Sequence, residues 1–175
     1  MAAYGMVKHK VVFGNIIFSL ILMGMMFSPY VIQVPNYLIV NAFGMVDTYW
    51  ALVIPKIAVA YNLFLVRQFM LQVPDSFLEA ARIDGAGEMH IFFKIVIPSI
   101  KPVIATLVVF SFVGNWNDFF TPLLFTQNQA LKTLPLAMQL ISSGSSIARA
   151  GATGAATFLV IVPTILVYVL TQKHV

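Results

Sequence analysis

Long apolar runs separated by shorter polar segments dominate the chain from end to end. Four of these runs are close to or longer than the ~20 residues that a helix needs to cross a bilayer. They cover residues 11–27, 50–71, 103–125 and 148–170. Apolar runs of this length are typical of membrane-spanning helices. The pattern therefore predicts an all-α, polytopic membrane protein with four transmembrane helices.

The first run permits a second interpretation, because a basic start followed by an apolar centre is also the layout of a secretory signal peptide. Lys8 and Lys10 supply the basic start. Residues 23–27 offer no small-residue cleavage site, and an aromatic stretch containing proline follows them. These features favour a membrane span over a cleaved signal.

Composition and motifs narrow the function classes. Hydrophobic residues make up 60% of the chain and charged residues 9%, with a mean hydropathy of +0.92. Soluble domains average about 45–50% apolar residues and about 25% charged residues. The chain has no cysteine, no Gly-x-x-x-x-Gly-Lys-Ser/Thr phosphate loop and no Gly-x-Ser-x-Gly motif. His9, His90 and His174 are far apart in the sequence. We therefore expect no enzyme activity, no metal site, no cofactor and no nucleic-acid partner.

The longest polar interruption lies between residues 73 and 102 and contains four of the six acidic residues. Ser76 followed three positions later by Glu79 matches a capping box. This spacing predicts a helix that starts near Phe77, with Asp75 as an alternative cap one residue earlier.

Gly85 divides this interruption, since glycine readily adopts the left-handed conformation that ends a helix. A second helix is predicted over residues 87–97, and Pro98 and Pro102 stop or kink it. Its apolar residues at helical spacing predict one buried face. That face consists of Met89, Phe92, Phe93 and Val96.

The same segment resembles a known signature. The pattern reads Glu79-Ala80-Ala81, three residues, Gly85, nine residues, Ile95 and then Ile97-Pro98. It resembles the EAA loop of the permease subunits of binding-protein-dependent ABC importers. The resemblance extends from about residue 27 to residue 169 and is greatest with the carbohydrate branch, the maltose-type inner permease. The one departure is Ile97, where the family usually has leucine.

This resemblance implies a function and a set of partners. Residues 73–102 would form a cytoplasmic helix-turn-helix coupling loop that docks on an ATPase subunit. The positions implied in coupling are Glu79, Ala80, Ala81, Asp84, Gly85, Ile95 and Pro98. The implied partners are a second permease, two ATPase subunits, an extracytoplasmic solute-binding protein and the lipid bilayer, and the implied solute is a sugar or oligosaccharide.

Basic residues set the expected orientation, because cytoplasmic loops carry an excess of Lys and Arg. With both chain ends and residues 73–102 in the cytoplasm of a bacterial cell, seven of the ten basic residues lie on that side. These are Lys8, Lys10, Arg67, Arg82, Lys94, Lys101 and Lys173. Lys56 and Arg67 are expected to extend from the two ends of the second span toward water.

A polar patch interrupts the third span at Asn115, Trp116, Asn117 and Asp118. At ~1.5 Å per residue from Pro102, this patch would lie ~20 Å into the membrane. Polar groups at that depth must face protein or a water-filled path. Amides that bond sugar hydroxyls and an indole that stacks on a sugar ring would form a solute-pathway wall. Hydrogen bonding between helices is the structural alternative.

Small residues at four-residue spacing begin the fourth span. Gly151 with Ala155, and Ala152 with Ala156, are small-xxx-small pairs that allow helices to approach closely. They predict packing against another helix, including one of a partner permease.

Two further expectations concern completeness and rival functions. The family usually has six spans, so the four spans here suggest a subunit that lacks the N-terminal two. An autonomous channel or facilitator and a non-transport assembly subunit remain the alternatives, and a membrane enzyme would need a nucleophile or metal cluster that the sequence lacks.

Overall fold

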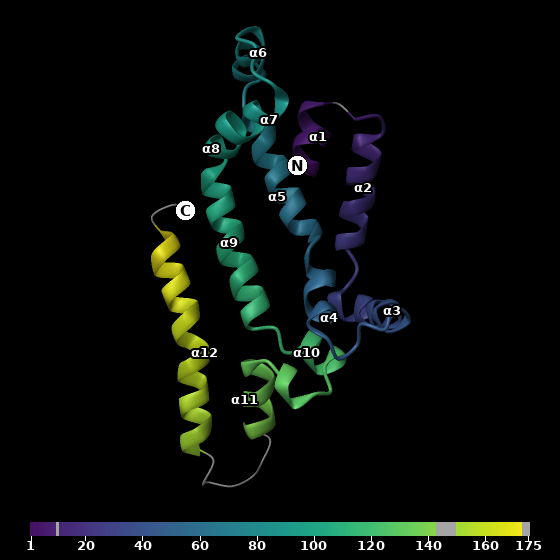
Figure 1. Ribbon diagram of the computed structural model, residues 1–175, viewed down its shortest axis with the longest axis vertical. Coiled ribbons are helices and arrows are strands. Elements are labelled where there is room, and N and C mark those ends of the chain that lie inside the picture. The colour runs from purple at the N-terminus through teal and green to yellow at the C-terminus, as the bar shows by residue number, and fades with distance from the viewer. Residues whose placement is uncertain (10, 143–149, 173–175) are drawn as a thin grey trace. The chain divides into compact units, whose positions relative to one another are not determined.

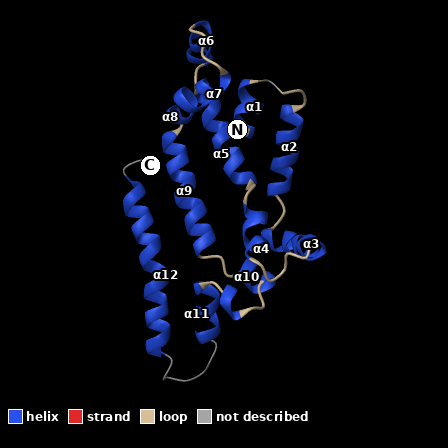
Figure 2. Ribbon diagram, viewed as in Figure 1, coloured by secondary structure: helices blue, strands red, loops and turns tan. Residues whose placement is uncertain are grey.

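The computed structural model describes residues 1–9, 11–142 and 150–172, and all regular structure in these ranges is helical (Figure 2). The all-α prediction is therefore confirmed. Contacts divide the chain into two units. Unit 1 comprises residues 1–27 and 58–107, and unit 2 comprises residues 28–57 and 108–172. Lys10, the first two residues of the predicted fourth span (Ala148 and Arg149) and Lys173 lie outside the described residues.

The helices alternate between the two units along the chain (Figure 1). Unit 1 contains α1 (Ala2–Lys8), α2 (Gly14–Met25), α5 (Ala60–Gln72), α6 (Asp75–Ile83), α7 (Glu88–Ile91), the π-helical turn η2 (Phe92–Val96), α8 (Ile97–Ser99) and the start of α9 (Lys101–Trp116). Unit 2 contains α3 (Pro29–Ala42), α4 (Tyr49–Val53), η1 (Ile54–Lys56), the end of α9, α10 (Phe120–Phe125), η3 (Gln129–Leu131), α11 (Leu134–Ser142) and α12 (Ala150–Thr171).

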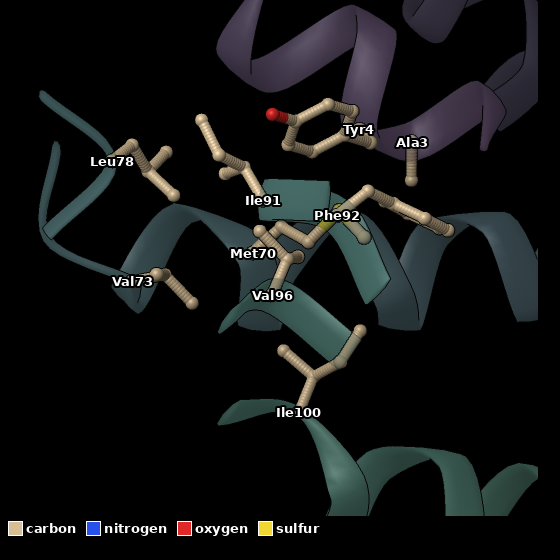
Figure 3. Packing of buried hydrophobic residues seen from close by; sticks show 9 residues of the cluster. All are labelled: Ala3, Tyr4, Met70, Val73, Leu78, Ile91, Phe92, Val96 and Ile100. Atoms are coloured by element: carbon tan, nitrogen blue, oxygen red, sulfur yellow. The ribbon is translucent and has the colours of Figure 1, made fainter. Parts of the chain in front are cut away.

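Unit 1 is held by one hydrophobic cluster that joins segments far apart in the sequence (Figure 3). Its buried members are Ala3, Tyr4, Met70, Val73, Leu78, Ile91, Phe92, Val96 and Ile100. Burying one large apolar side chain is worth about 1.5–3 kcal/mol. The cluster therefore fixes α1, the end of α5 and the segment 73–102 against one another.

Arg67 on α5 does not extend free toward water. Its guanidinium lies 3.9 Å from the centroid of the Phe18 ring on α2, and its Nη2 donates to Asn15 Oδ1 at 3.3 Å. An arginine over an aromatic face gains cation–π attraction that grows as water is removed. This contact holds α5 to α2, in place of the outward extension that the sequence suggested.

Unit 2 has a smaller core of Val40, Ala51 and Phe125. Asp47 ties the α3–α4 connection to the segment after α10. Its carboxylate accepts hydrogen bonds from the backbone N–H groups of Gln127 at 2.9 Å and Asn128 at 2.8 Å. Asp47 itself has φ +63°, a conformation in which aspartate is tolerated better than most residues.

Membrane-length helices are present. Two helical segments, Tyr49–Gln72 and Gly151–Thr171, are long and apolar enough to cross a bilayer. The count rises to four if α2 with α3, and the helices from Glu88 to Ser99 with α9, each form one bent span.

Two of the predicted spans differ from simple continuous helices. The second is interrupted after η1, which contains Pro55, and helix resumes at Ala60. The third ends at Trp116 instead of running on to residue 125, and α10 follows it as a separate helix. Proline cannot donate a backbone hydrogen bond, and the α-helix α4 accordingly gives way to the 3-10 turn η1 around Pro55.

Candidate functional site

The helix α6 begins at Asp75, two residues after the start of the polar segment and directly after Pro74. The residue before a proline is restricted to extended conformations, and Val73 has ψ 116°. The chain therefore turns into the helix at Asp75, and no side chain accepts a capping hydrogen bond. The capping-box prediction for Ser76 and Glu79 is wrong, because Pro74, not Ser76, precedes the first turn.

The turn after α6 agrees with the sequence prediction. Gly85 has φ +81°, and a Cβ at this position would meet no other atom within 4 Å. The requirement for glycine therefore comes from the backbone conformation, since residues with a Cβ resist positive φ. Gly85 reverses the chain between α6 and α7.

The α6 helix lies at one end of unit 1, beyond α7 and α1 (Figure 1). Glu79 and Ala80 are exposed, and Glu79 makes no ion pair within the described part of the chain. Ile83 is 86% exposed, although isoleucine is usually buried. An acidic residue, a small residue and a bare apolar residue on one short helix form a surface suited to docking.

The remaining coupling candidates surround the turn. Asp84, Gly85 and Pro98 are exposed, whereas Ala81 and Ile95 are half-buried. A hollow of about 560 Å³ opens beside them. It is lined by Ala81, Asp84, Gly85, Ala86, Gly87, His90 and Ile95. The structure thus brings four of the seven predicted coupling residues to one concave surface, while Glu79, Ala80 and Pro98 lie outside its lining.

The second helix of the segment carries a different buried face from the predicted one. Phe92 and Val96 are buried, as expected, but Met89 is 60% and Phe93 55% exposed. The π-helical turn η2 widens the helix there, and a π turn shifts the positions that share a face. Ile91 takes part in the core instead.

A polar network fastens the N-terminal helix to this segment. The Tyr4 hydroxyl donates to Glu88 Oε2 at 2.7 Å, and Arg82 Nε donates to Glu88 Oε1 at 2.7 Å. His9 Nε2 lies 3.3 Å from Glu88 Oε2. Glu88 therefore links α1, α6 and α7, and we call Tyr4, His9, Arg82 and Glu88 the Glu88 network.

The network shifts the acid–base equilibria of its members. Hydrogen bonds from Arg82 and then Tyr4 lower the pKa of Glu88 to about 2. Burial, followed by the hydrogen bond to Glu88, raises the pKa of Tyr4 to about 12. Both shifts favour the protonation states that the hydrogen bonds need, an ionised Glu88 and a neutral Tyr4.

Lys8 makes a second connection between α1 and the segment. Its ammonium group donates to the Val73 carbonyl and to Asp75 Oδ1, both at 2.7 Å, and its side chain is only 5% exposed. The lysine lies next to the C-terminal end of α5, where carbonyls lack helical partners. It therefore satisfies the end of one helix and the first residue of the next.

The polar patch of the third span lies at the end of α9 in unit 2. Trp116 Nε1 donates to the Val160 carbonyl of α12 at 2.9 Å, and its ring stacks on Phe112. Asn117 Nδ2 donates back to the Val113 carbonyl at 3.0 Å. Trp116 thus makes a contact between helices, which was the structural alternative for this patch.

Asp118 and Asn115, the other two residues of the patch, have different surroundings from Trp116 and Asn117. Asp118 Oδ1 accepts from the backbone N–H groups of Phe120 at 3.0 Å and Thr121 at 3.1 Å, and Oδ2 forms an ion pair with Lys56. Lys56 therefore does not extend toward water. Asn115 is exposed and, with Lys56, lines a cavity of about 370 Å³.

The small residues of α12 are mostly exposed. Gly151, Ala152 and Ala155 are exposed, whereas Ala156 is 8% exposed in unit 2. Three of the four predicted packing positions are therefore exposed within unit 2.

Several residues of these sites are not evident from the sequence. They are Tyr4, Lys8, His9, Lys56, Arg82, Glu88 and Thr133. Most of them act across more than 60 positions of sequence, where no local pattern reports the contact. Arg82 and Glu88 alone are near enough for their opposite charges to have suggested a pair.

Helical segments long and apolar enough to cross a bilayer indicate a membrane protein. The chain belongs to the family described as "Binding-protein-dependent transport system inner membrane component", whose model matches residues 1–175. The resemblance read from residues 79–98 is therefore confirmed, and the family is one of transporter subunits.

Three relatives illustrate the family. Protein LplC of Bacillus subtilis is 35% identical over 98% of this chain and 62% of its own length. The polygalacturonan/rhamnogalacturonan transport system permease protein YtcP of the same organism is 32% identical over 99% of this chain and 65% of its own length. The sn-glycerol-3-phosphate transport system permease protein UgpE of Yersinia enterocolitica is 34% identical over 99% of this chain and 62% of its own length.

A solved structure has the same fold. It belongs to a bacterial ABC transporter involved in the import of the acidic polysaccharide alginate, with a TM-score of 0.85 and 26% identity. The match covers 98% of this chain and 65% of that one. The chain thus spans somewhat less than two thirds of the length of these relatives.

Proposed function

We propose that the chain is a permease subunit of a bacterial ABC importer that couples ATP hydrolysis on a separate subunit to solute movement. The observation that carries the proposal is the exposed α6 helix at one end of unit 1, with Glu79 and Ile83 on its surface. Family membership supports it, because the family description names binding-protein-dependent transport.

The coupling mechanism follows from the chemistry of this surface. Glu79 offers a charge for a basic residue of the ATPase subunit, and Ala80 lets that subunit approach closely. Ile83 would lose its exposure to water on docking, which contributes to binding. When a charge pair becomes desolvated in such a contact, truncating one partner costs about 2–5 kcal/mol of binding free energy.

The connections of α6 provide the route for the movement. The Glu88 network and the Lys8–Asp75 pair join α6 and α7 to α1, and the hydrophobic cluster joins them to α5. A displacement of α6 on the ATPase would therefore move the ends of these helices together. Reorientation of the spans would then alternate the access of the solute site between the two sides of the membrane.

The arrangement in the membrane is part of the proposal. The spans lie near residues 11–27, 50–71, 103–125 and 148–170, with residues 73–102 and both ends of the chain in the cytoplasm. The cluster of basic residues around α6 and α8 supports this orientation. A second permease, two ATPase subunits and a solute-binding protein would complete the importer, and the exposed Gly151, Ala152 and Ala155 offer a surface to the second permease.

The proposed solute is a sugar or another polyhydroxylated compound. Two relatives are named for the transport of polygalacturonan/rhamnogalacturonan and of sn-glycerol-3-phosphate, and the similar solved structure for the import of alginate. All of these compounds carry hydroxyl groups. Asn115, Trp116, Asn117 and Asp118 are the candidate pathway residues, and Asn115 is the one exposed in the cavity of unit 2.

The proposal is tested by Glu79→Gln in the assembled importer, with ATPase recruitment to membrane vesicles and ATP-driven uptake as readouts. We expect weakened recruitment or hydrolysis without uptake, because the charge is lost while the shape remains. Ser76→Ala is the matched control on the same helix, since Ser76 makes no capping bond. Full recruitment and uptake in Glu79→Gln would exclude the charge pair, and uptake without ATP would indicate a channel instead.

A further inference from the structure

The cavity of unit 2 contains features that the proposed permease function does not by itself require. Its polar lining residues are Lys56, Asn115 and Thr133, and its apolar walls are Leu52, Val53, Ile57 and Pro122. Its volume of about 370 Å³ is near the lower end of the range for small-molecule sites. Apolar walls with a few convergent polar groups are the usual composition of a site for a small organic ligand.

The charges in the cavity wall are balanced. Lys56 is the one charged residue of the lining, and Asp118 neutralises it in an ion pair in which the two side chains are 27% and 17% exposed. The other carboxylate oxygen of Asp118 is occupied by the backbone N–H groups of Phe120 and Thr121. The pair is therefore held in place from the Asp118 side.

One polar group of the lining lacks a partner. The hydroxyl oxygen of Thr133 is buried without a hydrogen bond within the described residues. A buried hydroxyl without a partner is costly, which indicates that a ligand or water hydroxyl completes it. The exposed amide of Asn115 can both donate to and accept from such a hydroxyl.

We propose that this cavity is a subsite for an uncharged, hydroxylated part of the transported solute, and that the Lys56–Asp118 pair excludes acidic groups by keeping the cavity neutral. Asn115 and Thr133 bond the hydroxyls, and the apolar walls cover the carbon face of a sugar ring. The assignment of solute rests on the proposed permease function, whereas the charge balance does not.

The chain has no cysteine, so a Val53→Cys reporter in the cavity wall can measure this balance. Intact importer in vesicles is labelled with an anionic and a cationic methanethiosulfonate of similar size, carrying sulfonatoethyl and trimethylammonioethyl groups. A unit charge ~8 Å away changes the local concentration of a charged reagent roughly fivefold at an effective dielectric constant of ~40. The ratio of the two labelling rates therefore reports the charge at the site.

We expect a ratio close to that of a free thiol with the pair intact. Asp118→Asn keeps the acceptor oxygen for Phe120 and Thr121 and should raise the anionic-to-cationic ratio at least about fivefold. Lys56→Gln should lower it by a similar factor, and the double variant should restore it. An unchanged ratio in both single variants, or a ratio that already favours the anionic reagent, would overturn the neutral subsite.

Protection of the same cysteine tests the ligand class. Maltotriose should slow labelling of the cysteine when the Lys56–Asp118 pair is intact, and its protection should be weaker in Thr133→Val. Trigalacturonate should slow labelling only in Asp118→Asn. Failure of both saccharides to protect would overturn the subsite. ATP-driven uptake is measured in parallel. If uptake is absent but the labelling ratio still changes in the two single variants, the result counts against the permease function. If uptake is normal but the labelling ratio does not change, the result counts against this inference.

Discussion

Tyr4 and Glu88 are 84 positions apart in the sequence, yet the Tyr4 hydroxyl donates a 2.7 Å hydrogen bond to the Glu88 carboxylate. The bond fixes the first helix of the chain to the segment that carries the proposed coupling surface. Tyr4 is 5% exposed, and its ring also packs in the hydrophobic cluster of unit 1. One side chain thus combines apolar burial with a polar contact.

The first prediction concerns this bond. Tyr4→Phe keeps the ring and removes the hydroxyl, so we expect about 1 kcal/mol less stability of unit 1 and faster proteolysis of residues 73–102. Both are measurable in detergent, by thermal unfolding and limited digestion. Tyr49→Phe is the matched control, because Tyr49 is 69% exposed. Equal effects of the two substitutions would contradict a specific role for Tyr4.

The second prediction concerns pH. The pKa of Glu88 is lowered from 4.5 to about 2 in the folded chain, so the folded state binds its proton less readily than the unfolded state. Its contribution to stability is present above pH ~4.5 and lost as the pH falls toward 2. We expect the unfolding midpoint to fall less between pH 6 and pH 3 in Glu88→Gln than in the unaltered chain.

An exposed carboxylate provides the control for the pH experiment. Asp84 makes no ion pair within the described residues, so Asp84→Asn should leave the pH dependence as it is. If Glu88→Gln and Asp84→Asn changed it equally, the dependence would reflect general charge and not the Glu88 network.

The third prediction tests whether the α6–α7 turn needs glycine for its backbone conformation or for lack of room for a side chain. Gly85 has φ +81° and Gly87 has φ −71°, and a Cβ at either position meets no atom within 4 Å. Gly85→Val should cost about 1–2 kcal/mol or redirect α6, and should reduce ATPase recruitment. Gly87→Val should change both readouts little. A tolerated Gly85→Val would show that the turn does not position the coupling surface.

The fourth prediction concerns orientation. Single cysteines introduced at Asp84 and Gln129, in a chain that has none, can be labelled with a membrane-impermeant thiol reagent. We expect labelling of intact cells at position 129 and not at position 84, because the basic residues cluster near α6. Labelling at 84 from outside would reverse the proposed topology.

The local features of the coupling segment were predictable because their causes are local. Gly85 ends α6 since only glycine readily adopts positive φ, and the apolar runs predicted helices without any tertiary information. The start of α6 was missed because two local signals compete there. Pro74 occupies the N-cap position, so Ser76 already lies in the first turn of α6 and does not cap it.

Other features could not be read from the sequence. The buried face of the second helix was predicted from ideal helical spacing, and the π-helical turn at Phe92–Val96 changes that spacing and exposes Phe93. The Lys56–Asp118 pair joins positions 62 residues apart. Neither residue has a local pattern that identifies its partner, so the sequence predicted Lys56 to extend toward water and Asp118 to belong to the polar patch.

The helix α9 contains residues of both units. Within the described residues the chain passes between the two units three times, after residues 27, 57 and 107. The first two passages fall between helices, where rotation about a few backbone bonds can absorb movement. The third runs inside α9, an unbroken helix from Lys101 to Trp116. Asn115 therefore lies on the same unbroken helix as Lys101, so a rotation of α9 about its own axis would turn Asn115 with it.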